Sequence, residues 1–270
     1  MCKKVARVRD IEMAYEDAGR GEPFVLLLHG FPFDRSMWRE QARALAETWR
    51  VVVPDLRGLG ETSLGEAGGA ATMEEMAADV AALLDELNVG RAVVCGLSMG
   101  GYVALAFCRA FPERVRALVL ADTRALPDTD DARRAREENA RRALSEGVAP
   151  IADAMMPKLL SEGTIANRPE TVARVREMIL NAKPEGVAAA LRGMARRRDQ
   201  TDLLEEIEAP TLIVVGREDT FSTPSEAGEM RGKIRGARLR IIEGAGHLSN
   251  VERPEEFSRA LVDFLRGLPS

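Results

Sequence analysis

The sequence predicts an α/β protein in which helices cover both faces of a mostly parallel β-sheet. Short apolar runs of strand length alternate with helical patterns over the first 121 residues. Several of these runs are continuously apolar, as in strands that are buried on both faces. The alternation stops over residues 124–198, where only helical patterns occur, and then resumes. This interruption predicts a helical insertion within one α/β core.

The composition is that of an ordinary globular chain of 270 residues. Its 38 basic and 43 acidic residues give a net charge of -5, so nothing predicts binding to nucleic acid or to a membrane surface. No apolar run approaches the ~20 residues that span a bilayer, and the N-terminal stretch lacks the apolar region of a secretory signal, so we expect a cytoplasmic protein. Cys2, Cys95 and Cys108 are odd in number and lack metal-site spacing, which argues against a disulfide framework or a zinc site.

The first half of the chain supplies most of the expected core elements. Two alternating segments broken at Arg9-Asp10 predict a hairpin over residues 3–18, and the apolar run 24–28 predicts a buried strand. Ser36 is the expected cap of a helix over residues 36–48. The remaining elements of this half are expected as a strand over 50–54, a helix over 72–87, a strand over 93–95, a helix over 99–111 and a strand over 115–121.

The insertion, residues 124–198, is expected to form a helical cap on a core made of residues 1–123 and 199–270. Breaks at residues 147–150, Pro157, Pro169 and Pro184 divide it into about four helices. The core then resumes with expected strands over 211–215 and 239–242 and a closing helix over 253–268.

One stretch of the core indicates chemistry. Gly96-Leu97-Ser98-Met99-Gly100 follows a buried strand and opens a helix, which is the setting of a G-x-S-x-G nucleophile elbow. At such a turn the serine has strained backbone angles and its oxygen stands clear of the sheet. Little bulk is tolerated nearby, which explains the glycines Gly96 and Gly100. Ser98 is therefore the candidate nucleophile.

A serine hydroxyl is a weak nucleophile and needs a base to take its proton. Of the two histidines, His247 lies in a loop after the last expected strand and is the better candidate, whereas His29 is expected to order its own loop by hydrogen bonding. An acid must hold the imidazole in one tautomer. Asp219, in the loop after the strand 211–215, has the chain position for this role. Asp122, which follows another central strand, is the alternative.

The negative charge that develops on a substrate carbonyl oxygen during acyl transfer needs hydrogen-bond donors. The backbone N–H of Met99 follows the candidate nucleophile and begins a helix whose dipole favours an anion. The other expected donor is the backbone N–H of Phe31, in the loop after His29 and Gly30. Phe31 and Met99 are thus the candidate oxyanion hole.

Five motifs occur in a characteristic order over nearly the whole chain outside the insertion. They are His29-Gly30-Phe31-Pro32, Asp55-Leu56-Arg57-Gly58-Leu59-Gly60, Gly96-Leu97-Ser98-Met99-Gly100-Gly101, Gly216-Arg217-Glu218-Asp219 and Gly246-His247. Together they resemble the α/β-hydrolase fold family, and within it the bacterial carboxylesterases and the enol-lactonases that open 3-oxoadipate enol-lactone. The resemblance implies an eight-stranded, mostly parallel sheet with a helical lid between the sixth and seventh strands. One departure is Thr62, where many members have serine.

The residues and the resemblance together predict a serine carboxylesterase that hydrolyses short- to medium-chain esters through an acyl-enzyme intermediate, with no metal or organic cofactor. The alternative is an enol-lactone hydrolase, whose acidic substrate needs a cationic residue in the pocket. A binding protein that has kept a hydrolase pocket is a further alternative. Carbon–carbon bond hydrolases and cofactor-free perhydrolases keep the same triad, whereas dehalogenases and epoxide hydrolases of the family have an aspartate in place of Ser98.

The substrate is expected to bind beneath the cap. Packing between cap helices is the simpler expectation for each methionine there, and pocket lining is the alternative. Arg196-Arg197-Arg198 is interpreted as a solvated helix end, with attraction of an acidic substrate as the alternative. The expected partner is a small ester or lactone, and a monomer and a homodimer fit the sequence equally. The candidate lining residues are Met155, Met156, Met178 and Met194.

Overall fold

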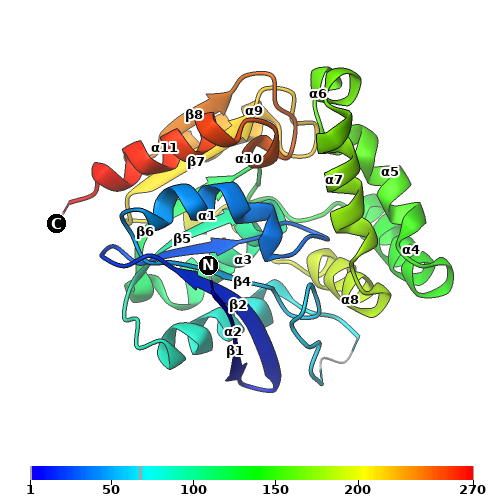
Figure 1. The fold of residues 1–270 in the computed structure, drawn as a ribbon, viewed down its shortest axis with the longest axis horizontal. Coiled ribbons are helices and arrows are strands. Elements are labelled where there is room, and N and C mark those ends of the chain that lie inside the picture. Colours follow the sequence, from blue (N-terminus) through cyan, green and yellow to red (C-terminus); the bar gives the residue numbers. More distant parts are fainter. Residues whose placement is uncertain (1, 67–68, 270) are drawn as a thin grey trace.

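The computed structural model describes residues 2–66 and 69–269, and within them an eight-stranded sheet forms the centre of the molecule (Figure 1). The strand order is β1-β2-β4-β3-β5-β6-β7-β8; β1 and β2 run antiparallel to their neighbours, and the other strands pair in parallel. The strands are β1 (Cys2–Val8), β2 (Ile11–Ala18), β3 (Val25–Leu28), β4 (Val51–Pro54), β5 (Ala92–Leu97), β6 (Val115–Ala121), β7 (Thr211–Gly216) and β8 (Arg238–Ile242).

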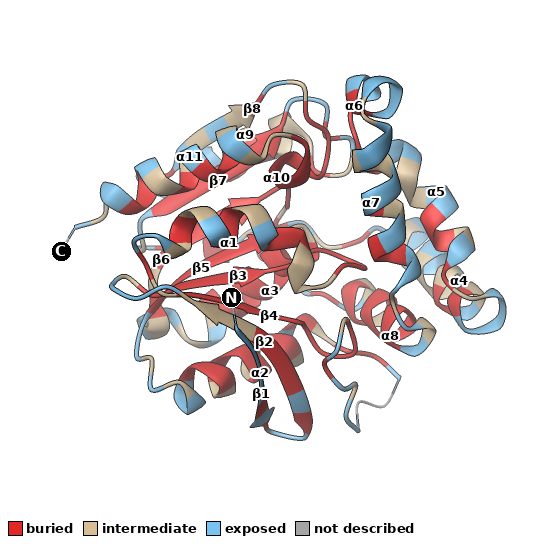
Figure 2. Cartoon of the chain, in the orientation of Figure 1, coloured by how far each residue is buried: buried red, intermediate tan, exposed pale blue. Residues whose placement is uncertain are grey.

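Helices cover both faces of the sheet, as predicted. Helices α2, α3 and α9 pack in one hydrophobic layer, and α1 and α11 pack in the other. The central strands β3 to β7 and the inner sides of these helices are buried, while the outer sides of the helices and much of the edge strands β1 and β8 are exposed or only partly buried (Figure 2). In the described parts of the chain, no helix is both long and apolar enough to cross a membrane. The helices are α1 (Arg39–Ala46), α2 (Met73–Glu86), α3 (Met99–Ala110), α4 (Asp130–Glu146), α5 (Ala149–Leu159), α6 (Glu162–Asn167), α7 (Pro169–Leu180), α8 (Pro184–Ala195), α9 (Pro224–Lys233), α10 (Ser249–Glu252) and α11 (Pro254–Arg266), with short 3-10 turns at Arg35–Trp38, Pro112–Arg114 and Leu203–Glu205.

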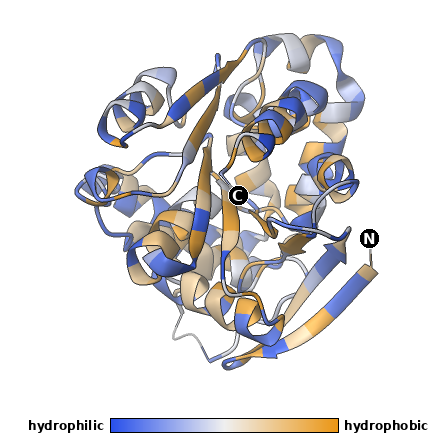
Figure 3. Cartoon of the chain, turned by 90° about the vertical axis from the view of Figure 1, so that its left-hand side faces the viewer, coloured by the Kyte–Doolittle hydropathy of each residue, from blue (hydrophilic) through white to orange (hydrophobic). Residues whose placement is uncertain are grey.

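The position of strand β3 in the sheet explains why its sequence is continuously apolar. Leu26 and Leu28 point into the layer of α2 and α3, whereas Val25 and Leu27 point into the layer of α1 and α11. Each face of the strand is therefore covered by helices. The edge hairpin of β1 and β2 differs, since hydrophobic and hydrophilic bands alternate along it near the N-terminus (Figure 3).

Helices α4 to α8 follow β6 and precede β7 in the sequence, and they gather on one side of the molecule (Figure 1). The described residues of this segment form five helices, whereas the sequence predicted about four. Pro150, Pro169 and Pro184 lie in the first turns of α5, α7 and α8, where the missing N–H costs nothing. Pro157 does not mark a break, because it lies inside the last turns of α5. The division into core and cap stays a prediction.

One expectation about the start of a helix was wrong, and one helix was missed. Asp34, not Ser36, is the cap before α1: its carboxylate accepts the N–H of Ser36 at 2.7 Å and starts a 3-10 turn that leads into the helix. Helix α9 was not predicted, because it shows no clear apolar stripe. Its start does carry a recognisable signal, a capping box in which Thr223 and Glu226 satisfy each other's backbone N–H groups.

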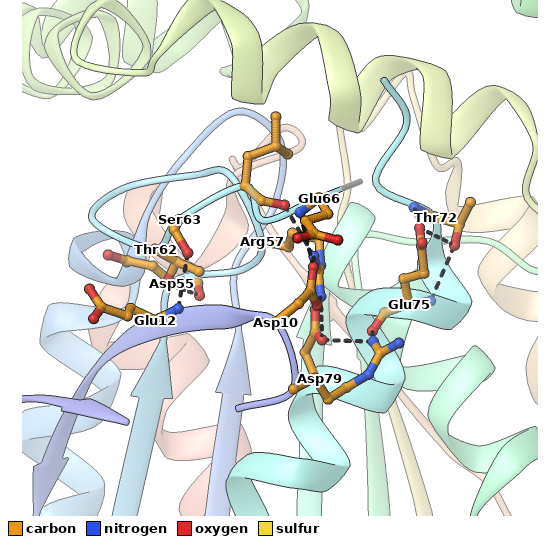
Figure 4. Close-up of polar contacts among 12 residues, drawn as sticks. Asp10, Glu12, Asp55, Arg57, Thr62, Ser63, Glu66, Thr72, Glu75 and Asp79 are labelled. Carbon is orange, nitrogen blue, oxygen red and sulfur yellow. Dashed lines mark hydrogen bonds and ion pairs between the residues drawn. The ribbon is translucent and has the colours of Figure 1, made fainter. Parts of the chain in front are cut away.

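The loop after β4 is anchored by a buried arginine (Figure 4). Arg57, only 2% exposed, donates to both carboxylate oxygens of Asp79 at 2.7 Å and to those of Asp10 at 2.7 and 2.9 Å. It also donates to the carbonyl oxygen of Leu64 at 3.1 Å. These bonds hold the pKa of Asp10 well below its usual range, with the Arg57 hydrogen bond as the main cause. The network ties the β1–β2 turn, the loop after β4 and helix α2 together.

Candidate active site

Ser98 lies at a sharp turn between β5 and α3. Its φ of +53° and ψ of −113° place it in a strained region for a residue with a side chain. The close packing of the turn accounts for the flanking glycines. A Cβ at Gly96 would lie 2.1 Å from the carbonyl oxygen of Gly100, and a Cβ at Gly100 would lie 2.1 Å from that of Leu28.

The structure brings Ser98, His247 and Asp219 into one hydrogen-bonded line. Ser98 Oγ lies 2.8 Å from His247 Nε2, across 149 residues of sequence. His247 Nδ1 lies 2.8 Å from Asp219 Oδ2. His247 is in the loop between β8 and α10, and Asp219 follows β7, so two loops at the carboxyl ends of parallel strands meet the turn after β5.

The hydrogen bonds around Asp219 fix the tautomer of the imidazole. Asp219 Oδ1 accepts the backbone N–H groups of Phe221 and Ser222 at 2.8 and 3.0 Å, which leaves Oδ2 for His247. A carboxylate only accepts hydrogen bonds, so Nδ1 of His247 carries the proton and donates it to Asp219. Nε2 then has a free lone pair directed at the hydroxyl of Ser98.

The rival acid, Asp122, occupies a different place. One of its oxygens accepts the N–H of Gly216 at 2.8 Å and the other is bonded to the hydroxyl of Ser249. The side chain is fully buried, and this burial, followed by the nearby charge of Asp219, raises the pKa of Asp122. Asp122 therefore supports the loops after β7 and β8, while His247 has Asp219 as its carboxylate partner.

Both candidate oxyanion residues lie close to Ser98. Met99 is the first residue of α3, where a backbone N–H has no carbonyl partner within the helix. Phe31 lines the same cavity as Ser98. The preceding residue, Gly30, packs against the turn so closely that a Cβ there would lie 3.3 Å from Leu97 and 3.5 Å from the side chain of Ser98.

His29 has no part in this line of hydrogen bonds. Its Nε2 accepts the backbone N–H of Leu56 at 2.9 Å, so the proton is on Nδ1, which donates to the carbonyl oxygen of Gly30 at 2.9 Å. Burial lowers the pKa of His29 and keeps it neutral. The ring thereby links the loop after β3 to the loop after β4.

A cavity of about 80 Å³ opens at Ser98 and His247. Met155 and Met194 line it, but Met156 and Met178 do not; these two pack in a hydrophobic cluster that includes residues of α5 and α7. A larger groove of about 580 Å³ lies elsewhere on the surface and contains none of the candidate site residues. The cavity at Ser98 is lined by Phe31, Ser98, Tyr102, Arg124, Arg136, Met155, Met194, Phe221 and His247.

Four of these lining residues were missed in the sequence. Tyr102 lies one helical turn after the candidate nucleophile, a spacing that could have identified it. Phe221 follows the candidate acid by two residues, and its ring centroid lies 4.9 Å from that of His247. Arg124 and Arg136 carried no signal, since the direction of a long side chain depends on tertiary packing.

The cavity wall carries an excess of positive charge. Arg124 Nη1 lies 3.4 Å from Glu226 Oε1, a long ion pair. Asp128 is paired with two arginines, Arg136 and Arg197. Arg124 and Arg136 line the cavity, whereas their carboxylate partners Glu226 and Asp128 lie outside its lining, and Asp128 is shared with Arg197. Such an excess favours a ligand with a negative charge.

The interpretation of Arg196-Arg197-Arg198 as a solvated helix end was wrong for its middle residue. Arg196 and Arg198 are exposed, but the side chain of Arg197 is only 4% exposed. Arg197 Nη1 lies 2.6 Å from Asp128 Oδ1, and its guanidinium carbon lies 4.4 Å from the ring centroid of Tyr102. Arg197 therefore supports the cavity wall from behind.

The fold and this site define a class of protein. A sequence profile described as the alpha/beta hydrolase fold matches residues 23–254, so the chain belongs to the α/β-hydrolase fold family. Among solved structures it is similar to a thermophilic esterase from Thermogutta terrifontis with malate bound, at 45% identity, a TM-score of 0.95 and full coverage of both chains. It is also similar to the enol-lactonase from Burkholderia xenovorans, at 30% identity and a TM-score of 0.90 over 97% of this chain and all of that one.

A further relative is also an enol-lactonase. The chain is 28% identical to 3-oxoadipate enol-lactonase 2 of Acinetobacter baylyi over 260 residues, which cover 96% of this chain and 95% of the relative. The family and these esterase and enol-lactonase relatives support a hydrolytic enzyme.

Proposed function

We propose that the chain is a serine hydrolase of carboxylic esters that acts through an acyl-enzyme intermediate. The observation that supports the proposal is the line of two 2.8 Å contacts from Ser98 to His247 and from His247 to Asp219. His247 Nε2 takes the proton of Ser98 as the serine oxygen attacks the substrate carbonyl carbon. Asp219 stabilises the imidazolium that results. His247 then gives the proton to the departing alcohol.

The second half of the reaction reverses the first with water in place of the alcohol. His247 removes a proton from the water, which attacks the acyl group on Ser98; the bond from the acyl carbon to Ser98 Oγ then breaks, His247 returns the proton to that oxygen, and the acid leaves. In both halves the backbone N–H groups of Met99 and Phe31 stabilise the negative oxygen of the tetrahedral intermediate. Loss of one such donor typically costs ~10²-fold or more in rate. The chain's own residues supply every proton transfer.

The proposed substrates are esters with short to medium acyl chains, with helices α4 to α8 acting as a cap over the pocket. A cavity of about 80 Å³ is small beside the ~300–1,000 Å³ of sites for drug-sized ligands. A specific observation favours a second candidate, the hydrolysis of a lactone that carries a carboxylate. Arg124 and Arg136 both line the cavity and could pair with such a group.

Initial rates on matched substrates distinguish the two candidates. We expect kcat/KM for p-nitrophenyl butyrate to exceed that for a carboxylate-bearing enol-lactone. The physical reason is that the two arginines of the cavity already have carboxylate partners: Arg124 pairs with Glu226 and Arg136 pairs with Asp128. A preference for the acidic lactone of tenfold or more would instead assign the second candidate, and turnover of neither substrate would contradict both.

The roles of the two buried aspartates are separable by isosteric substitution. In Asp219→Asn the amide oxygen keeps the N–H groups of Phe221 and Ser222, so the amide NH2 faces His247 and forces its proton onto the wrong nitrogen. We expect kcat to fall by about 10⁴-fold. In Asp122→Asn the amide oxygen still accepts the N–H of Gly216 and the amide NH2 donates to the hydroxyl of Ser249, so we expect a loss of less than about tenfold. Steady-state kinetics on both variants checks this, and the reverse pattern would make Asp122 the acid.

A further inference from the structure

Two cavities meet at one side chain. The cavity at Ser98 has a neighbour of about 90 Å³ that lies between the start of the inserted segment and helix α9. Among the residues that the structure describes, Arg124 is the one that lines both. Four apolar residues, Ala125, Leu126, Leu204 and Met230, line part of the second cavity, and the rest of its lining beside Arg124 is polar or charged, namely Thr201, Glu226, Glu229 and Lys233. The two cavities are therefore adjacent, and the side chain of Arg124 separates them.

The position of Arg124 is fixed at both ends. Its chain neighbour Thr123 donates its hydroxyl to the carbonyl oxygen of Ser98 at 2.8 Å, which holds the root of the side chain against the nucleophile turn. The guanidinium end is held by Glu226 Oε1 at 3.4 Å. Glu226 is in turn immobilised at the start of α9. Its other carboxylate oxygen, Oε2, accepts the backbone N–H of Thr223 at 2.8 Å and the hydroxyl of Thr223 at 3.1 Å.

We propose that Arg124 sets the size of substrate that the site accepts, by closing the cavity at Ser98 against the second cavity. This inference rests on the proposed ester hydrolysis and names the residue that limits the length of the ester. With Arg124 in place, the substrate group that occupies this end of the site is limited to about 80 Å³. Without its side chain, a longer alkyl group extends past position 124 and lies against Leu204 and Met230.

The expected gain follows from apolar burial. Each methylene group that leaves water for an apolar site improves binding by roughly fourfold. The second cavity adds room for several methylene groups beyond position 124. We therefore expect a change in the dependence of kcat/KM on chain length, rather than a uniform change for all esters.

The test compares Arg124→Ala with Arg124→Met on neutral esters. Alanine removes the side chain, whereas methionine removes the charge and keeps most of the bulk. The substrates are p-nitrophenyl esters from acetate to decanoate, which vary the acyl chain, and alkyl acetates, which vary the alcohol. The ratio of kcat/KM for the eight-carbon to the four-carbon member is expected to rise at least about tenfold in one series for Arg124→Ala, and by less than about threefold for Arg124→Met. Arg133→Ala, on the exposed side of α4, controls for the loss of a surface arginine.

The result that would overturn the proposal is an unchanged ratio in both series, or an equal rise in the alanine and methionine variants. The latter would mean that charge, not bulk, limits the chain length. Failure of the proposed function would look different, since the wild-type protein would then hydrolyse no ester in the panel. A calorimetric comparison of octanoate and butanoate binding to Ser98→Ala and to Ser98→Ala with Arg124→Ala gives the same ratio without turnover. A ratio that is equal in these two proteins, together with an unchanged ratio in the alkyl acetate series, would also overturn the proposal.

Discussion

Replacing Ser98 with alanine is expected to lower kcat for ester hydrolysis by about 10⁴-fold or more while the protein stays folded. In the proposed mechanism, the substitution removes the one atom that forms the bond to the substrate carbonyl. The turn itself remains supported, because the carbonyl oxygen of residue 98 still accepts the hydroxyl of Thr123 and the N–H groups of Gly101 and Tyr102. Activity that remains would come from substrate binding and the oxyanion donors.

The measurement is steady-state hydrolysis of p-nitrophenyl butyrate, with thermal unfolding as the control for folding. The unfolding temperature is expected to stay close to that of the wild type. Turnover within about tenfold of the wild type, in a variant that unfolds normally, would show that Ser98 is not the nucleophile.

The second large effect concerns stability rather than chemistry. Replacing Arg57 with methionine is expected to lower the free energy of unfolding by about 3–5 kcal/mol, because it leaves the buried carboxylate of Asp79 without its main partner. Asp79 is fully buried, and Arg57 donates to both of its oxygens. Arg57 also fixes Asp10 and the carbonyl of Leu64, so three segments lose a common anchor.

Arg9→Met is the matched control for this prediction. Arg9 contacts the same carboxylate at 2.8 Å, but its side chain is 41% exposed. An exposed pair typically contributes about 0–1 kcal/mol, so a small loss is expected. Urea denaturation of both variants at neutral pH measures the difference. Equal losses, or a loss below 1 kcal/mol for Arg57→Met, would contradict the role assigned to the network.

The elements that the sequence predicted correctly are those whose own residues determine their structure. The apolar run of β3 is readable because both faces of the strand are covered, so every side chain must be apolar. Helix α2 is readable from its apolar spacing and from the capping box of Thr72 and Glu75. Helix α9 has a comparable cap but lacks an apolar stripe, and it was missed.

The parts of the site that were not predicted depend on tertiary packing. Ser98, Asp219 and His247 were placed together because the order of strands brings the ends of β5, β7 and β8 to one edge of the sheet. The order of strands does not determine whether Met155 or Met156 faces the cavity, because the two residues are neighbours in the same turn of α5. Arg197 is buried against Asp128, from the segment before α4, and against the ring of Tyr102.

The most direct test of the proposed function is covalent labelling of the native protein with a fluorophosphonate, followed by intact-mass and peptide mass spectrometry. The reagent mimics the tetrahedral intermediate and reacts with a serine that its neighbouring base has activated. We expect one phosphonyl group per chain, on the peptide that carries Ser98, and no label on Ser98→Ala. Absence of labelling on folded wild-type protein would favour a binding protein that has kept the fold, and labelling of another residue would contradict the assignment of the nucleophile.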